Sequence, residues 1–140
     1  IREDARMGIH PIEIPVIGCD ISAESVRIAK ENVSRSLLPK GSVEITQQNY
    51  HDITPPEAPG LLVMNPPYGE RLKIEDAVDF YKKIGDTLKS NFSGYDAWII
   101  SGNKEAFKQI GLRASKKHAL LNGSIECKYH KFEMYRGSKK

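Results

Sequence analysis

An apolar run that ends in two consecutive prolines is the feature that most constrains this chain. Leu61-Leu62-Val63-Met64 has the length and character of a buried strand, and Asn65-Pro66-Pro67-Tyr68 follows it directly. Each proline fixes its own φ, lacks a backbone donor and keeps the residue before it out of the helical region. The strand therefore has to end at Asn65, at the carboxyl edge of a sheet, where α/β proteins place their binding sites.

The groups that remain at this strand end are two acceptors and an aromatic ring. The Asn65 side-chain carbonyl and the Pro66 backbone carbonyl accept hydrogen bonds, and the Tyr68 ring follows them. Two acceptors can bind the two hydrogens of a planar amine while the ring stacks on the base that carries the amine. A plain Asn-Pro turn is the structural alternative.

Strand and helix patterns alternate along the rest of the chain. Apolar or alternating runs predict further strands at residues 14–20, 42–48 and 95–101. Apolar residues at helical spacing predict helices at 22–36, with Ser22 as N-cap, and at 75–91. The predicted buried stripe of the first helix is Val26, Ala29, Val33 and Leu37. The predicted stripe of the second helix is Ala77, Phe80, Tyr81, Ile84 and Leu88.

The C-terminal part favours an antiparallel pair of strands. A turn at Gly102 and Asn103 leads into a short helix ending at Ile110, and strands are expected at residues 113–121 and 124–136. Asn122-Gly123 joins them as a strong hairpin dipeptide. The apolar face of the last strand changes phase along its length, which predicts a bulge.

The extended motif resembles that of a known enzyme family. Asn65-Pro66-Pro67-Tyr68-Gly69-Glu70-Arg71-Leu72 is similar to the THUMP-containing large-subunit ribosomal RNA guanine-N2 methyltransferases, and the similarity runs from Gly18-Cys19-Asp20 to the final strand. The resemblance implies the class I methyltransferase (Rossmann-like) α/β sheet with an antiparallel C-terminal hairpin. It also implies S-adenosyl-L-methionine as cofactor, Asn65, Pro66, Pro67 and Tyr68 as catalytic motif, a base in RNA as substrate and an upstream THUMP-type domain.

Methyltransferases of this type carry a Gly-rich loop after their first strand. No Gly-x-Gly occurs in these 140 residues, and the order of motifs would place that loop before Ile1. We therefore expect residues 1–140 to form the C-terminal part of a catalytic domain whose N-terminal portion is absent.

Acidic and amide side chains follow the first two predicted strands. Asp20 closes the first strand, where a carboxylate can accept hydrogen bonds from both hydroxyls of an adenosine ribose, or can cap the following helix. Ile21 would then lie against the adenine. Counting from the Asp20 helix favours Asn49 as partner of the adenine amine, and counting back from Asn65 favours Asp52, which is preferred as the usual family residue. Asn65 itself is expected to border the cofactor.

Composition and charge narrow the class of protein. No apolar run approaches the length of a membrane span, and Cys19 and Cys127, at no metal spacing, are expected to be reduced thiols of a cytoplasmic protein. Residues 104–140 hold ten Lys/Arg and three Asp/Glu, whereas the net charge of the whole chain is only +3. This basic C-terminal third, with Lys116, Lys117 and Lys128, suggests a surface that faces RNA phosphates.

Other functions share parts of this pattern. DNA adenine methylases and protein glutamine methyltransferases share the four-residue motif, although the extension through Leu72 and the basic tail argue for RNA. A further alternative is not an enzyme but a non-catalytic module that binds RNA. Glu70 and Arg71 could shape the base pocket, contact phosphate or form a surface ion pair.

Overall fold

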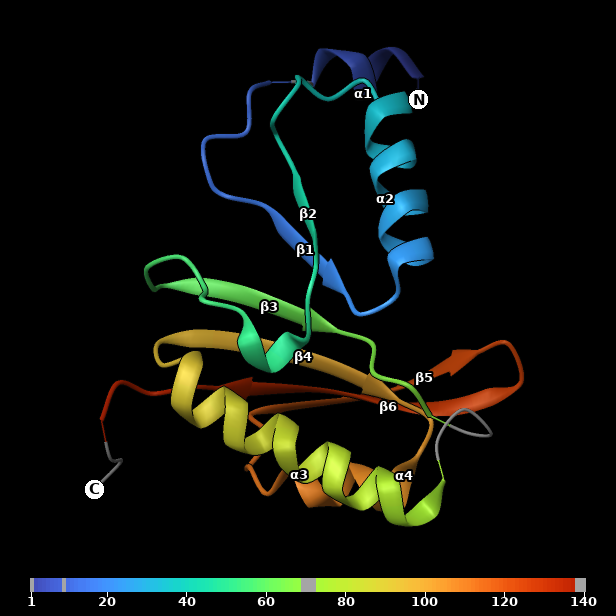
Figure 1. Ribbon diagram of the computed structural model, residues 1–140, viewed down its shortest axis with the longest axis vertical. Coiled ribbons are helices and arrows are strands. Elements are labelled where there is room, and N and C mark those ends of the chain that lie inside the picture. Colours follow the sequence, from blue (N-terminus) through green and yellow to red (C-terminus); the bar gives the residue numbers. More distant parts are fainter. Residues whose placement is uncertain (1, 9, 69–72, 138–140) are drawn as a thin grey trace. The chain divides into compact units, whose positions relative to one another are not determined.

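The computed structural model describes residues 2–8, 10–68 and 73–137, so the expected roles of Glu70 and Arg71 concern positions outside the described residues. The chain divides into two compact units, Ile1–Ile53 and Thr54–Lys140, and each is described by itself (Figure 1). The first unit contains α1 (Arg2–Met7), β1 (Ile17–Asp20), α2 (Ala23–Arg35), β2 (Glu44–Gln47) and the 3₁₀ turn η1 (Tyr50–Asp52).

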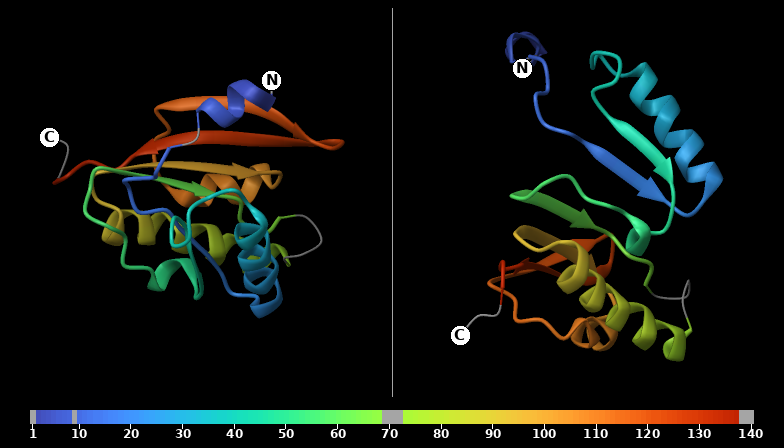
Figure 2. Two further views of the ribbon diagram at one scale, coloured as in Figure 1. Left: turned by 90° about the horizontal axis from the view of Figure 1, so that it is seen from above. Right: turned by 60° about the vertical axis from the view of Figure 1, so that its left-hand side comes forward.

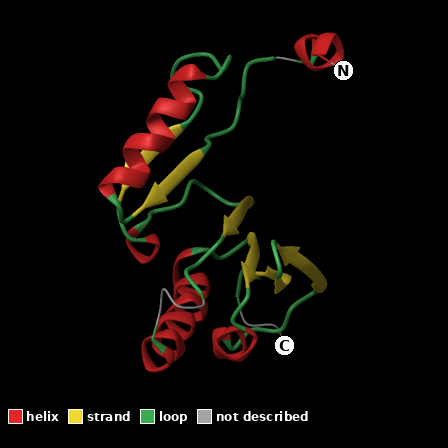
Figure 3. Ribbon diagram, turned by 90° about the vertical axis from the view of Figure 1, so that its right-hand side faces the viewer, coloured by secondary structure: helices red, strands yellow, loops and turns green. Residues whose placement is uncertain are grey.

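The first unit is a parallel strand pair beside one helix (Figure 3). β1 and β2 pair in register from Ile17 opposite Glu44 to Asp20 opposite Gln47. The predicted strand at 14–20 is correct only from Ile17, because the ladder begins there and Ile14 is 72% exposed. β1 is half-buried rather than buried.

The predicted helix at 22–36 is confirmed to within one residue. Ser22 is its N-cap and accepts a hydrogen bond from Ser25 N, which satisfies one of the free donors of the first turn. Val26 is buried, but Leu37 is 78% exposed, so the predicted stripe extends too far. The helix ends at Arg35 with Ser36 as C-cap, and Leu37 lies beyond the last turn.

The second unit is a mixed sheet covered on one face by helices (Figures 1 and 2). Its strands are β3 (Gly60–Met64), β4 (Tyr95–Ser101), β5 (Lys116–Asn122) and β6 (Ile125–Glu133), in the order β3-β4-β6-β5. β3 and β4 are parallel, and the other pairs are antiparallel. α3 (Ile74–Asn91), α4 (Lys104–Phe107) and the 3₁₀ turn η3 (Lys108–Ile110) complete the unit.

The core lies between α3 and the sheet. The predicted stripe of α3 is confirmed at Ala77, Tyr81, Ile84 and Leu88, which are at most 1% exposed, whereas Phe80 is only half-buried. Ala97 and Ile99 of β4 meet this layer and are 0% exposed. Gly85 lets η3 approach the helix closely, because a Cβ at this position would lie 1.9 Å from the Ile110 carbonyl oxygen.

The opposite face of β3 is open in the described chain. Leu61 and Val63 are 64% and 63% exposed, so the prediction of a buried strand is wrong for this face. β3 forms one edge of its sheet, with β4 as its only partner among the described residues. Its sequence has the continuous apolar character of a strand that is covered on both faces.

The hairpin differs from the prediction in two ways. Asn122 is the last residue of β5, paired with Ile125, so the two-residue loop is Gly123–Ser124 rather than Asn122-Gly123. Gly123 has φ +62°, and glycine is the residue that takes the first position of a type II′ turn. The predicted bulge is wrong, because β6 pairs one-to-one with β5 and β4 along its length. The apolar residues of β6 change phase because one face of the strand is buried near its start and the opposite face near its end.

Candidate functional site

The motif Asn65–Tyr68 leaves the carboxyl end of β3 as irregular backbone. Pro66 is buried, Tyr68 is half-buried, and Asn65 is exposed. Within the described part of the chain the Asn65 side chain makes no hydrogen bond, so its carbonyl is available to a ligand. The structure thus presents the predicted acceptor at the predicted strand end.

A buried hydrogen-bond chain holds the motif from the side of α3. Tyr81 Oη lies 3.3 Å from the Pro67 carbonyl oxygen and 2.5 Å from Ser101 Oγ, and Asn103 N donates to Ser101 Oγ at 3.1 Å. Tyr81 has one hydroxyl hydrogen, so if it goes to Pro67 then Ser101 must donate to Tyr81. This orientation satisfies every group in the chain.

Burial keeps this hydroxyl protonated. Tyr81 and Ser101 are both 0% exposed, and burial raises the pKa of Tyr81 above its usual value, although the bond to Ser101 opposes the rise. Sequence reasoning assigned Tyr81 to the core stripe and missed its polar role. The only sign of this role in the sequence is that Tyr81 brings a hydroxyl group into a stripe of residues that is expected to be buried.

We expect Tyr81→Phe to destabilise the chain by about 1–3 kcal/mol, because it leaves the hydroxyl hydrogen of the buried Ser101 without its acceptor and the Pro67 carbonyl without its donor. Urea unfolding followed by fluorescence of Trp98 measures this loss. Tyr135→Phe is the matched control, since the Tyr135 hydroxyl bonds to Glu133 at the surface. Equal stabilities of the two variants would contradict a structural role for the Tyr81 chain.

The Tyr68 ring packs against the sheet at Gly102. A Cβ at Gly102 would lie 2.9 Å from two ring carbons of Tyr68 and 2.7 Å from Ile125 Cγ2, so ring and isoleucine both pack on the Gly102 backbone. Tyr68 Oη accepts from Asn122 Nδ2 at 2.6 Å. Gly102 and Asn122 were expected only as turn residues, and the structure gives both a contact with the motif.

The candidate cofactor residues of the first unit meet at one edge of its sheet. Asp20 ends β1, and Gln48 N donates to the Asp20 carbonyl oxygen at 3.1 Å. Gln47 Nε2 donates to the Ile21 carbonyl oxygen at 3.2 Å, which ties the loop after β1 to the end of β2. Asp20, Ile21 and Asn49 therefore follow adjacent strand ends.

Asp20 makes the capping contact that was the structural alternative. Its Oδ1 accepts from Ser22 N at 2.7 Å, at the start of α2. A carboxylate has about four acceptor positions, so this bond leaves capacity for two ribose hydroxyls. Ile21 is 69% exposed, which leaves an apolar side chain uncovered directly after the strand.

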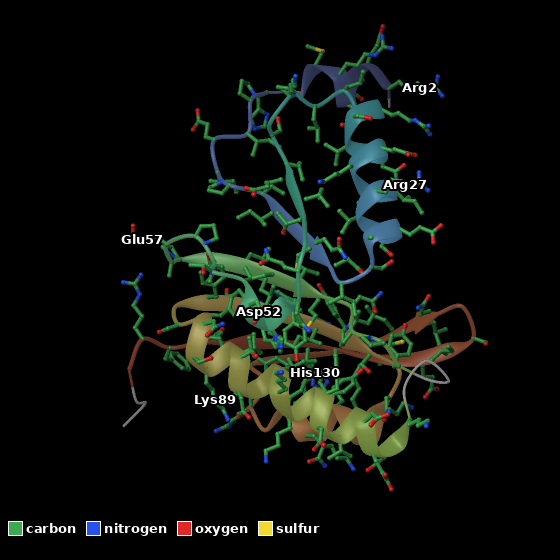
Figure 4. All side chains as sticks on the ribbon, viewed as in Figure 1. Arg2, Arg27, Asp52, Glu57, Lys89 and His130 are labelled. Atoms are coloured by element: carbon green, nitrogen blue, oxygen red, sulfur yellow. The ribbon has the colours of Figure 1, made fainter. Side chains whose placement is uncertain are left out.

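Asn49 and Asp52 have different surroundings. Asn49 is half-buried, precedes η1 and makes no side-chain cap bond to it. The Asp52 side chain is 70% exposed, lies on η1 and is 3.6 Å from His51 Nδ1 (Figure 4). Asn49 is thus nearer to the strand end, and Asp52 has a neighbouring side chain with which it can pair.

Two of the lysines that were expected to face RNA lie on opposite faces of the sheet. Lys116 and Lys117 are consecutive in β5 and so point to opposite faces of the sheet. Lys128 Nζ donates to the Lys104 carbonyl oxygen at 3.3 Å. A surface that faces RNA can therefore include Lys116 or Lys117 on one face of the sheet, but not both.

None of the helices in the described part of the chain is long and apolar enough to cross a membrane. The cysteines are free, with Cys19 half-buried in β1 and Cys127 buried in β6.

Comparison with known proteins identifies close relatives. Residues 1–131 match the family described as UPF0020, RMKL-like, methyltransferase domain. The ribosomal RNA large subunit methyltransferase K/L of Methylococcus capsulatus is 37% identical over 134 residues, which are 95% of this chain and 18% of that protein. The Synechocystis sp. protein slr0064, named among the RNA methyltransferases, is 42% identical over 125 residues, 89% of this chain and 32% of its own length.

A solved structure supports the same fold. The crystal structure of SMU.472 complexed with SAH superimposes with a TM-score of 0.82 at 28% identity, covering 98% of this chain and 36% of that one. The predicted class I methyltransferase fold is therefore confirmed. The chain spans between 18% and 36% of the length of these relatives.

Proposed function

Because the chain belongs to the UPF0020 family of RMKL-like methyltransferase domains, we propose that it is part of an enzyme that methylates an exocyclic amine of a base in RNA. The target class that the name of the Methylococcus capsulatus relative supports is large-subunit ribosomal RNA. Guanine N2 is the amine that the resemblance of the extended motif at residues 65–72 implies. A ribosomal RNA substrate also favours a cytoplasmic enzyme. The observation that carries the proposal is the exposed Asn65 at the end of β3, within a motif whose Pro67 and Tyr68 are both held by side chains.

The motif would act on the nucleophile. The lone pair of an amine on an aromatic base is delocalised into the ring, which makes the amine a poor nucleophile. Acceptance of its two hydrogens by the Asn65 side chain and the Pro66 carbonyl favours a pyramidal nitrogen with a freer lone pair. Alignment supplies much of the remaining acceleration, and no strong general base is needed. The base has to leave its stack to reach the motif, and the Tyr68 ring would hold it there.

The end of β1 and β2 fits the adenosine part of S-adenosyl-L-methionine, which supplies an activated methyl group when bound. Asp20 offers acceptors for ribose hydroxyls, and the exposed Ile21 offers an apolar surface for the adenine. For the adenine amine, the geometry of the first unit favours Asn49 over Asp52, because Asn49 directly follows the strand end and its side chain caps nothing. SAH, bound to SMU.472, is the demethylated form of the same cofactor.

Asp20→Ala in the full-length protein is expected to weaken cofactor affinity by about 1–3 kcal/mol, because the ribose hydroxyls lose a charged acceptor. Asn49→Ala is expected to weaken it by about 1 kcal/mol, and Asp52→Ala to leave it within about 0.5 kcal/mol. Isothermal titration with S-adenosyl-L-methionine measures all three. Glu24→Ala removes an exposed carboxylate from the first turn of α2 and serves as the control. An unchanged dissociation constant for a folded Asp20→Ala protein would make Asp20 a helix cap alone.

We also propose that residues 1–140 are the C-terminal part of the catalytic domain, with an upstream strand and Gly-rich loop, and a THUMP-type domain beyond them. The separate sheets β1-β2 and β3-β4-β6-β5, and the open apolar face of β3, support this view. The isolated chain should bind S-adenosyl-L-methionine at least about a hundredfold more weakly than the full-length protein, because contacts of the loop would be missing. Micromolar binding by the isolated chain in calorimetry would contradict this proposal.

Methyl transfer by the full-length protein tests the function directly. The cofactor carries a tritiated methyl group, and the acceptors are deproteinised large-subunit RNA, small-subunit RNA, unmethylated duplex DNA and total protein. Label in N2-methylguanine of large-subunit RNA is the expected result. Label in DNA adenine or in glutamine would select one of the rival methyltransferases. Binding of RNA without transfer to any acceptor would select the non-catalytic module.

A further inference from the structure

The Tyr68 hydroxyl lies close to one residue from each strand of the β5–β6 hairpin. Asn122 Nδ2 donates to Tyr68 Oη at 2.6 Å, across 54 residues of sequence. Cys127 Sγ lies 4.0 Å from the same oxygen and is 2% exposed. The hydroxyl is therefore bonded to the last residue of β5 and lies next to a buried residue of β6.

The ring itself is confined by neighbouring groups. It packs on the Gly102 backbone, and Ile125 Cγ2 packs on the same point. With the hydroxyl tied to Asn122, rotation of Tyr68 about its Cα–Cβ bond would carry the hydroxyl oxygen away and break the 2.6 Å contact. A side chain that is held before the ligand arrives loses less conformational freedom on binding, which increases affinity.

The position of Asn122 makes this contact possible. Asn122 ends β5 opposite Ile125, and the two-residue loop begins only at Gly123. In an antiparallel pair, directly opposed residues project to the same face, so Asn122 and Ile125 share a face with Cys127. The sheet thus directs the three side chains toward one aromatic ring.

We propose that Asn122 is a positioning residue for capture of the target base, acting through Tyr68, and that the end of β5 thereby supports the base-binding site. This inference rests on the proposed function and extends it to a residue that the motif does not contain. Asn122 holds the ring in the orientation on which an unstacked base can lie. Loss of the amide leaves the ring present but free to turn away from the base.

The test is a double-mutant cycle in the full-length protein, with Asn122→Ala, Tyr68→Phe and both together. Single-turnover methyl transfer to deproteinised large-subunit RNA is measured over a range of RNA concentrations. Each single variant should raise the half-saturating RNA concentration roughly threefold to tenfold, the effect of one hydrogen bond. The double variant should show no further rise, because both changes remove the same bond. In Asn122→Ala the limiting rate should fall less than twofold, whereas a general loss of folded protein would lower the amplitude instead.

Two variants separate positioning from hairpin damage. Asn122→Asp keeps an acceptor for the Tyr68 hydroxyl hydrogen and should restore most of the RNA affinity. Ser124→Ala changes the same hairpin tip, keeps both partners of the bond and should match the wild type. Additive effects of Asn122→Ala and Tyr68→Phe, or an unchanged half-saturating concentration in either, would overturn the proposal.

Hydrogen exchange provides a measurement that needs no methyl transfer. Amides of residues 116–125 should exchange faster in Asn122→Ala and in Tyr68→Phe, with no further increase in the double variant. If this coupling is found in a protein that transfers no methyl to RNA, the proposed function fails although the contact exists. If transfer to RNA occurs without coupling in either measurement, the function stands and the role of Asn122 is refuted.

Discussion

Asn65→Ala in the full-length protein should reduce the rate of methyl transfer by about a hundredfold or more, the size of effect that removal of one preorganised catalytic hydrogen-bond partner produces. The Asn65 carbonyl contributes most as the amine becomes pyramidal, so the loss belongs to the transition state rather than to the bound ground state. Affinities for S-adenosyl-L-methionine and RNA should therefore stay within about twofold of the wild type. The Asn65 side chain is exposed and makes no hydrogen bond within the described residues, so its removal breaks no hydrogen bond there.

Single-turnover transfer to large-subunit RNA, with both ligands saturating, gives the rate for this comparison. Asn32→Ala is the control, because it removes an exposed amide from α2. Tyr68→Ala should differ from Asn65→Ala by also weakening RNA capture, since stacking of a base on an aromatic ring contributes about 1–3 kcal/mol. An Asn65→Ala protein that keeps most of its rate would make the motif a structural turn.

Gly85→Ala should destabilise the second unit strongly, with an expected loss of about 3 kcal/mol. Helix propensity alone predicts the opposite sign, a gain of up to about 1 kcal/mol from replacing glycine in a helix interior. The added Cβ would lie 1.9 Å from the Ile110 carbonyl oxygen, however, and that atom belongs to the backbone and cannot rotate away. α3 and η3 would have to move apart, and the steric term exceeds the propensity term.

The consequence of this change reaches the motif. Tyr81 lies one helical turn before Gly85, so a displaced α3 would also pull the Tyr81 hydroxyl from the Pro67 carbonyl. Urea unfolding monitored at Trp98 measures the stability, and Lys82→Ala, on the exposed side of α3, should change it by less than about 0.5 kcal/mol. A Gly85→Ala protein as stable as the wild type would show that η3 can move without cost.

Local patterns predicted the elements well because local chemistry determines them. Ser22 starts α2 through its own hydroxyl, and the spacing of Ala77, Tyr81, Ile84 and Leu88 is sufficient to define the buried face of α3. The Asn-Pro-Pro sequence likewise ends β3 where expected. These features depend on residues close together in the chain.

The supports of the site could not be predicted, because they depend on pairing between distant segments. The bond from Asn122 to Tyr68 spans 54 residues, and the Tyr81–Ser101 bond spans 20. Asn122-Gly123 is a turn signal by itself, and only the pairing of Asn122 with Ile125 moves the turn forward by one residue. The phase change of β6 suggested a bulge because the sequence does not reveal that opposite faces of one strand are buried at its two ends.

The strict pairing of β5 with β6 also limits where the protein can accept extra sequence. One residue inserted within β5 would turn Asn122 to the opposite face, and two would carry it about 7 Å along the strand, beyond reach of Tyr68. An insertion between Gly123 and Ser124 leaves the pair of Asn122 with Ile125 in place. A fluorophore or cross-linker grafted into that two-residue loop would therefore report on RNA beside the motif while leaving the Asn122–Tyr68 bond intact.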